Sequence, residues 1–303
     1  MLSFRRVVGF LFALLFVHTI SYANDTVSVS MRDMRQKSGF TWSAGATLTS
    51  NYIWRGLYVG GLSLQVDATV GYKGLFANVW WNVGVRDWTC STLNPEVDFT
   101  IGYSRWGLTV LYLHMYYFDR YADGTMSKYF DFKNHVPGGG GTTGEWRVSY
   151  RVSDQIPLSC LVAVRTFGRD GYYEVKGGLG DEATLELKRA YSTYIELGYD
   201  FDIGDDWMLT ARVGVTPAKS LYTGYQGNFA VTLVGLKLNK SWDIGEKTMR
   251  REGDEAKRRA GRLNAFAHVM LQLWQVTKEN LIRPIEEAGN QKLNLAIGVS
   301  YGI

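Results

Sequence analysis

Eight charged residues occupy the polar positions of segments in which every second residue is apolar, and their chemistry suits contact with a solute. They are Asp67, Asp98, Glu145, Arg147, Arg151, Arg165, Glu196 and Arg212. Carboxylate and guanidinium groups on one wet face orient polar solutes and set ion preference, because charges act strongly at short range in a narrow passage. We therefore treat these eight residues as a candidate solute path.

The signs of these charges are unevenly distributed along the chain. The acidic residues come from early segments and the basic ones from later segments: Asp67 and Asp98 against Arg147, Arg165 and Arg212. A closed sheet would place the two signs on roughly opposite walls, which creates a transverse field. Alternatively, Glu196 and Asp200 neutralise the arginines in salt bridges, and the sequence leaves both arrangements open.

Histidines are the residues that would most directly indicate catalysis. Beyond residue 23 the chain has only His114, His135 and His268, and none lies in a motif known from acyl-ester hydrolysis. Isolated histidines on polar lumen positions are the simpler interpretation, although the sequence leaves open a Ser–His pair formed across strands. We predict no catalytic residues and no enzyme activity.

Metal and phosphate sites lack their usual sequence patterns. Cys90 and Cys160 lie far apart, and the histidines are scattered, so no metal-ligand spacing is present. The run Gly138–Gly141 has no Lys-Ser/Thr continuation, which indicates a flexible loop rather than a phosphate-binding loop. We predict neither a metal nor another cofactor.

The first 23 residues have the organisation of an export signal. Arg5 and Arg6 precede an apolar run over 7–17, and Ser21-Tyr22-Ala23 supplies small residues for cleavage. The apolar run is too short for a transmembrane helix, which needs about 20 residues; an uncleaved anchor is the alternative. The expected organisation is a signal peptide over 1–23, a periplasmic N-terminal segment over 24–39 and a β-barrel over 40–303.

The composition fits an exported β-protein better than a helical membrane protein. The 303 residues include 34 glycines, 10 Trp, 19 Tyr and 14 Phe, while the mean hydropathy is only −0.13. The formal net charge of +4 gives no indication of nucleic-acid binding.

A period of two dominates from Phe40 onward and predicts antiparallel strands. The segments 62–73 and 75–86 form a hairpin around Lys73-Gly74. Twelve segments follow this pattern: 40–54, 62–73, 75–86, 95–104, 108–119, 144–153, 158–168, 189–202, 206–216, 227–239, 262–276 and 291–303. The fifth, seventh and tenth alternate poorly. An even number fits an all-β, closed antiparallel barrel with both termini at one end.

Aromatic residues gather at the two ends of the apolar face. One group comprises Trp42, Tyr72, Tyr103, Tyr150, Tyr199, Phe201, Trp207 and Tyr301; the other comprises Tyr52, Trp81, Tyr117, Trp146, Tyr191 and Phe229. Two aromatic belts around an aliphatic band are typical of a barrel that spans a bilayer, because amphipathic rings settle at the headgroup level. A soluble β-sandwich or lipocalin-like barrel is the alternative that this distribution disfavours.

Short and long connections alternate, with the short turns expected on the periplasmic side. The long connection 120–143 could fold into the barrel. The charged stretch 240–261 is expected as a solvated loop or a short helix, with a partner-binding element as the alternative. Cys90 and Cys160 are expected at opposite ends of the barrel, too far apart for a disulfide.

Three stretches resemble a known family. Ser50-Asn51-Tyr52-Ile53-Trp54-Arg55-Gly56, Tyr72-Lys73-Gly74-Leu75 and the run from Glu96 to Ser104 are similar to segments of the TorF-like porin family, with Ser-x-Tyr-x-x-Arg-Gly as the most specific element. The resemblance implies an exported outer-membrane barrel that passes solutes passively. It supplies no catalytic residues.

These observations predict a twelve-stranded outer-membrane barrel of a Gram-negative bacterium, with periplasmic termini, that acts as a porin or channel for small polar solutes. The expected partners are outer-membrane lipid, small polar solutes and the barrel-assembly machinery, with no nucleic acid. Two alternatives remain: a barrel enzyme acting on lipid or surface substrates, and a plugged structural or surface-binding barrel.

Overall fold

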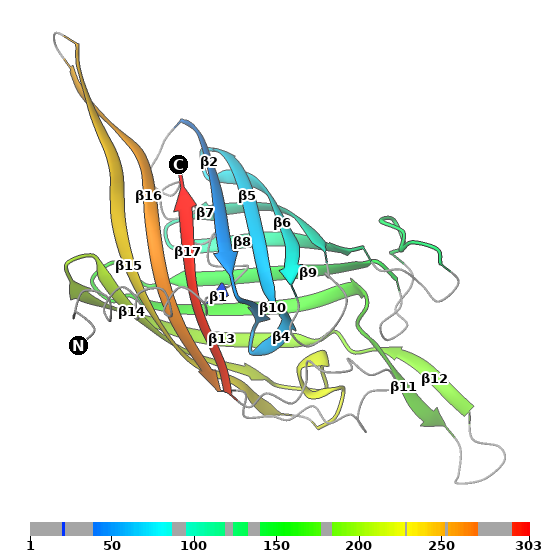
Figure 1. The fold of residues 1–303 in the computed structure, drawn as a ribbon. Coiled ribbons are helices and arrows are strands. Elements are labelled where there is room, and N and C mark those ends of the chain that lie inside the picture. Colours follow the sequence, from blue (N-terminus) through cyan, green and yellow to red (C-terminus); the bar gives the residue numbers. More distant parts are fainter. Residues whose placement is uncertain are drawn as a thin grey trace, which may run out of the picture.

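The fold is a closed antiparallel β-barrel of twelve strands (Figure 1). It is seen in a computed structural model that describes residues 20–21, 39–86, 95–118, 124–132, 140–176, 184–227, 229–251, 254–271 and 293–303. Around the barrel the strands follow the order β10-β13-β14-β15-β16-β17-β2-β5-β6-β7-β8-β9. The predicted fold class and the number of barrel strands are confirmed.

The barrel strands correspond one to one with the twelve predicted segments. Their bounds are β2 Phe40–Thr49, β5 Leu62–Tyr72, β6 Leu75–Arg86, β7 Glu96–Arg105, β8 Leu108–Tyr117, β9 Thr142–Arg151, β10 Leu158–Gly168, β13 Thr193–Gly204, β14 Trp207–Thr216, β15 Ala230–Arg251, β16 Asp254–Leu271 and β17 Leu293–Gly302. Three described elements belong to the long connections and not to the barrel wall. They are β11 Gly171–Lys176, β12 Thr184–Arg189 and the 3₁₀ turn η1 Leu221–Thr223.

The outer face of the barrel is apolar and exposed. Ile101 and Leu295 expose 63% and 57% of their surface, although they lie in the middle of regular strands. Aromatic residues expected at the belts, including Trp42, Trp81 and Trp146, are exposed on the same face. An apolar surface that surrounds the whole barrel cannot face water, so the fold is that of a transmembrane barrel.

Tight turns close one end of the barrel, where Phe40 and the C-terminal strand also lie. Lys73 and Gly74 have φ values of 50° and 94°, and Trp106 and Gly107 have 52° and 81°. Two consecutive positive φ values are typical of type I′ hairpin turns, which match the twist of the joined strands.

The stretch 240–261 is neither a loop nor a short helix, so that prediction is wrong. β15 runs to Arg251 and β16 begins at Asp254, and the two strands pair with each other far beyond their barrel neighbours (Figure 1). Asp243 and Arg262 face each other in this register and form an ion pair of 3.1 Å. A cross-strand pair of opposite charge stabilises a ribbon, so this ion pair supports the first part of the extension.

The first predicted segment, 40–54, is interrupted. The barrel strand β2 ends at Thr49, and the chain turns inward to form the hairpin β3 Asn51–Trp54 and β4 Leu57–Gly60. These strands belong to a separate three-stranded sheet with β1 Ile20–Ser21, which lies in the predicted signal peptide. We call residues 51–60 the lumen hairpin.

Two residues predicted for the outer belts point into the barrel instead. Tyr52 is buried in the lumen hairpin, because the chain has left the wall at this point. Tyr117 packs against an inner cluster that contains Leu113 and Met115. β8 carries apolar residues on both faces, so its sequence pattern did not show which face is turned towards the lumen.

The described part of the 120–143 connection does not fold inward. Residues 124–132 pack against the outer face of β8, where the ring of Tyr129 stacks on His114 at a centroid distance of 4.7 Å. Ser127 Oγ also donates to the carbonyl oxygen of Tyr117. The aromatic residues of this loop prefer the apolar exterior to a polar lumen.

Among the described residues, no helix has the length and apolar character needed to cross a bilayer.

Candidate functional site

The lumen hairpin extends into the barrel interior near the end that bears the long connections. One side packs Ile53 and Tyr58 against Leu233, Met270 and Ala296 of β15, β16 and β17. The other side packs against a second cluster, composed of Tyr52, Trp54, Trp80, Ala163, Tyr194 and Tyr222. Contacts with both sides of the wall place the hairpin across the lumen, so it constricts the barrel at this level.

The tip of the hairpin is a two-residue turn of the same kind as the turns at the other end of the barrel. Arg55 and Gly56 have φ values of 50° and 86°, as expected for a type I′ hairpin turn. A Cβ on Gly56 would lie 2.9 Å from the carbonyl oxygen of Thr232, so the wall approaches the turn too closely for any side chain.

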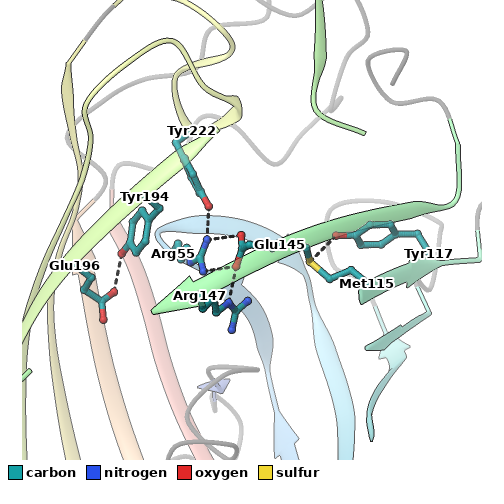
Figure 2. Close-up of polar contacts among 8 residues, drawn as sticks. All are labelled: Arg55, Met115, Tyr117, Glu145, Arg147, Tyr194, Glu196 and Tyr222. Atoms are coloured by element: carbon teal, nitrogen blue, oxygen red, sulfur yellow. Dashed lines mark hydrogen bonds and ion pairs between the residues drawn. The ribbon is translucent and has the colours of Figure 1, made fainter. Parts of the chain in front are cut away.

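Arg55 binds Glu145 of β9 in a bidentate ion pair. Its Nη1 and Nη2 donate to the two carboxylate oxygens at 2.8 and 2.7 Å (Figure 2). Glu145 is completely buried, and Arg147 Nε also donates to it at 2.5 Å. Two guanidinium groups therefore compensate one buried carboxylate, which a low-dielectric interior requires.

Aromatic rings enclose the Arg55 guanidinium. Its central carbon lies 4.5 Å from the ring centroid of Trp54 and 4.6 Å from that of Tyr194. The guanidinium of Arg165 lies 5.1 Å from the same Trp54 ring. These cation–π contacts hold the excess positive charge in place without adding a carboxylate.

Tyr52 anchors the base of the hairpin to the acidic side of the lumen. Its hydroxyl donates to Glu96 Oε2 at 2.9 Å, and its ring packs on Trp80 at a centroid distance of 5.6 Å. The hairpin therefore has polar attachments at both ends, one to an arginine-rich region and one to an acidic region.

The long-loop end holds the hairpin through Tyr222 of η1. Arg55 Nη1 donates to the Tyr222 hydroxyl at 2.6 Å (Figure 2). η1 is fixed in turn by Ser192, whose Oγ accepts from Leu221 N at 2.8 Å and donates to Asp170. Hydrogen bonds thus run from Asp170 and Ser192 through η1 to the tip of the lumen hairpin.

Asp170 lies in the turn between β10 and β11, beyond the spanning strands. Burial raises the pKa of its carboxyl, while the positive charge of Arg165 and the hydrogen bonds from Ser192 oppose this rise. Ser192 N and Oγ donate to its two oxygens at 2.7 and 2.5 Å. Asp170 therefore acts as the fixed acceptor on which η1 depends.

All eight residues of the candidate solute path lie on the inner face of the barrel wall. Arg151 pairs with Asp200 at 2.7 Å, and Arg212 lies 3.6 Å from Glu196. In the described part of the chain, neither Asp67 nor Asp98 forms an ion pair with a basic side chain.

The predicted separation of signs is therefore only partial. β14, which carries Arg212, lies five strands from β5 and from β7, but β9, which carries Arg147, lies two strands from β7. Arg212 pairs with Glu196, as the alternative prediction stated, whereas Arg147 pairs with Glu145, which it shares with Arg55. In the described part of the chain, Asp67 and Asp98 have no partner of opposite charge.

The sequence analysis missed the role of the lumen hairpin. Arg55 appeared only as part of a family motif, and Tyr222 did not appear at all. Glu145 lies 90 residues from Arg55 along the chain, so no local spacing indicates their contact. The available signal was the Arg-Gly pair followed by Leu57-Tyr58-Val59, which resembles a tight hairpin turn with a second strand.

The histidines and cysteines have simple environments. His268 is buried in the lumen, whereas His114 faces outward and is covered by aromatic rings, so it is not a lumen histidine. Cys160 is a free thiol. His135, Cys90 and Gly138–Gly139 lie outside the described residues. Within the described ranges, no cluster of three or more His, Cys, Asp or Glu side chains is arranged to hold a metal.

Comparisons with known proteins give structural similarity at low sequence identity. No family model and no curated protein matches the chain. Among solved structures, the NanC porin is 10% identical, with a TM-score of 0.38, and the alignment covers 86% of this chain and 98% of that one. The translocator domain of the autotransporter NalP from Neisseria meningitidis is 12% identical, with a TM-score of 0.37 and coverages of 92% and 95%. The fold assignment rests on the strand pairing of the chain itself.

Proposed function

We propose that this protein is an outer-membrane channel for small polar solutes, and that the lumen hairpin closes it in the conformation described. The observation that carries the proposal is the polar interior. Asn78 Oδ1, Trp80 Nε1 and Asp98 Oδ1 are buried on the inner face without a protein partner. Buried polar groups are normally hydrogen-bonded to protein or to water, so these atoms support a hydrated lumen.

The location in the outer membrane follows from three features taken together. Residues 1–23 have the sequence pattern of an export signal, the barrel is closed, and its exterior is apolar. A protein with these properties needs outer-membrane lipid around it and the barrel-assembly machinery for insertion. The short turns and the C-terminus would then lie in the periplasm. The proposal includes no catalytic step and no cofactor.

The hairpin suits a movable constriction because it is a short excursion between two wall strands. Residues 51–60 leave the wall after β2 and return at β5, so displacement breaks no barrel ladder. The sequence resemblance to TorF-like porins supports passive solute passage, with Ser50, Tyr52, Arg55 and Gly56 placed within or beside the hairpin.

The test replaces residues 51–60 by a short Gly-Ser linker and measures conductance in planar bilayers. We expect the variant to remain open, whereas the wild-type protein opens only in brief events. Heat-modifiable mobility and a β-sheet circular dichroism spectrum provide the folding control. A folded variant without conductance would overturn the proposal.

A structural barrel with a permanent plug is the second candidate. The observation that favours it is the apolar packing of the hairpin against both sides of the wall. This candidate predicts that the wild-type protein never conducts. It also predicts that removal of the hairpin lowers the free energy of unfolding.

A further inference from the structure

Asp67 is a buried carboxylate of the lumen, and no basic side chain in the described part of the chain compensates its charge. It lies on the inner face of β5, where its side chain is 9% exposed. A Cβ on Gly45 of β2 would lie 2.7 Å from Asp67 Oδ1, so the carboxylate rests over this glycine. The ion pairs that hold Glu145, Glu196 and Asp200 have no counterpart at Asp67 in the described part of the chain.

Two neutral side chains that carry oxygen atoms, Thr47 and Gln65, lie beside this carboxylate. Thr47 pairs with Gln65, and Gly45 pairs with Asp67, in the register between β2 and β5. Directly opposed residues have Cβ atoms about 5 Å apart, and residues two apart on one strand face are separated by roughly 7 Å. The three side chains therefore form one compact group on the wall.

Thr47 and Gln65 are almost completely buried, at 1% and 2% exposure, and their polar side-chain atoms have no partner in the structure. An unpartnered buried amide or hydroxyl costs roughly 1–3 kcal/mol. Such a cost at the Thr47 hydroxyl and the Gln65 amide oxygen, next to a carboxylate without a counter-charge, indicates a bound species that these oxygen atoms can coordinate.

We propose that Thr47, Gln65 and Asp67 form a binding site for one small monovalent cation of the alkali-metal class. The carboxylate, the amide oxygen and the hydroxyl are hard oxygen ligands, which suit such ions. Calcium sites draw on six to eight oxygen ligands and often on several carboxylates, whereas this group has a single negative charge. Gly45 leaves the space that the carboxylate occupies.

The site lies on the lumen wall, so an occupied site gives the passage a preference for cations. This consequence rests on the proposed channel function, whereas the binding itself does not. Asp67 carries the charge, and Thr47 and Gln65 position the ion through their oxygen atoms.

Crystals of the wild-type protein soaked in rubidium chloride test the binding directly. We expect an anomalous difference peak within coordination distance of Asp67, Gln65 Oε1 and Thr47 Oγ1, and we expect Asp67→Asn to abolish it. A wild-type map without this peak, or a peak that persists in Asp67→Asn, would overturn the site even if the protein conducts.

Reversal potentials in a potassium chloride gradient test the consequence. Asp67→Asn should shift the reversal potential towards that of a non-selective pore. Asp205→Asn, which removes the same charge from an exposed turn outside the lumen, should retain the wild-type value. An equal shift in both variants would remove Asp67 from the selectivity of the passage. A rubidium peak in a barrel that does not conduct would leave the site intact and reject the channel function.

Discussion

At the scale of single residues, the contact between Arg55 and Glu145 attaches the tip of the lumen hairpin to the wall. Both side chains are buried in the barrel interior, so both groups are taken out of water. The attraction between buried charges repays their desolvation only when the geometry is good and the remaining hydrogen bonds are satisfied. Here the pair is bidentate and Arg147 and Tyr222 complete it.

Arg55→Ala should therefore destabilise the hairpin while leaving the barrel assembled. Glu145 would lose its bidentate partner but keep Arg147, so the cost should stay below the roughly 3–5 kcal/mol that an uncompensated buried charge carries. We expect a higher open probability in planar bilayers and faster proteolysis within 51–60. Arg105→Ala, at an exposed turn at the other end of the barrel, serves as the control. Wild-type gating in Arg55→Ala would exclude this contact as the latch.

Gly56→Ala tests the close approach of the hairpin turn to β15. The new methyl group would meet the carbonyl oxygen of Thr232 at 2.9 Å, and the φ of 86° is unfavourable for alanine. We expect a loss of roughly 1–2 kcal/mol in the stability of the closed state, measured as an increase in channel opening. Gly60→Ala is the matched control, because no atom lies within 4 Å of its Cβ position. Equal effects of both substitutions would argue against a tightly seated turn.

At the scale of elements, the hairpin of β11 and β12 extends beyond the barrel and depends on cross-strand ion pairs. Lys176 pairs with Glu186 at 2.7 Å, and Lys188 pairs with Glu174. The hydrogen bond from Lys188 lowers the pKa of Glu174, and the hydrogen bond from Lys176 lowers that of Glu186. These side chains are exposed, so each pair contributes little by itself.

The pH dependence of this hairpin follows from the direction of these shifts. A carboxylate with a lowered folded pKa stabilises the hairpin above its unfolded pKa of about 4.3, and this contribution is lost as the pH falls through the folded pKa. We expect amide protection in β11 and β12 to decrease below about pH 4, after correction for the intrinsic exchange rate. Glu174→Gln/Glu186→Gln should show weaker protection with no such decrease. A decrease of equal size in this variant would assign the effect to other groups.

The elements also show how far the sequence could predict the structure. The period of two located all twelve barrel strands, because lipid on one side and water on the other impose strict alternation on most of them. The break at Ser50 escaped detection, since Tyr52 and Trp54 continue the even-numbered apolar positions of β2. Nothing in that pattern distinguishes an aromatic ring that faces lipid from one that packs inside the lumen.

The same limit applies to the candidate site. The eight charged residues could be assigned to one face, because a strand face is a local property. Their partners could not be assigned, since Arg55, Glu145 and Tyr222 meet only after the barrel closes and η1 folds over it. The charged ribbon beyond β15 and β16 was missed because composition alone does not reveal a cross-strand register.

At the scale of the whole molecule, a closed barrel wall surrounds the lumen hairpin, which packs against two sides of that wall. The outer connections reach that segment through Asp170, Ser192 and η1. A ligand or lipid that displaces η1 would therefore also remove the Tyr222 contact from Arg55. We propose that the channel opens and closes through movement of residues 51–60 alone.

A reversible tether between the hairpin and the wall tests this claim most directly. Ile53 and Leu233 are fully buried in the same cluster, so Ile53→Cys and Leu233→Cys, introduced with Cys90→Ser and Cys160→Ser, place two thiols between the hairpin and the wall. Oxidation is followed by mass spectrometry, and we expect the protein that carries the disulfide to stay closed in planar bilayers and reduction to restore brief openings. Equal conductance in the oxidised and reduced states, with the disulfide verified by mass spectrometry, would contradict it.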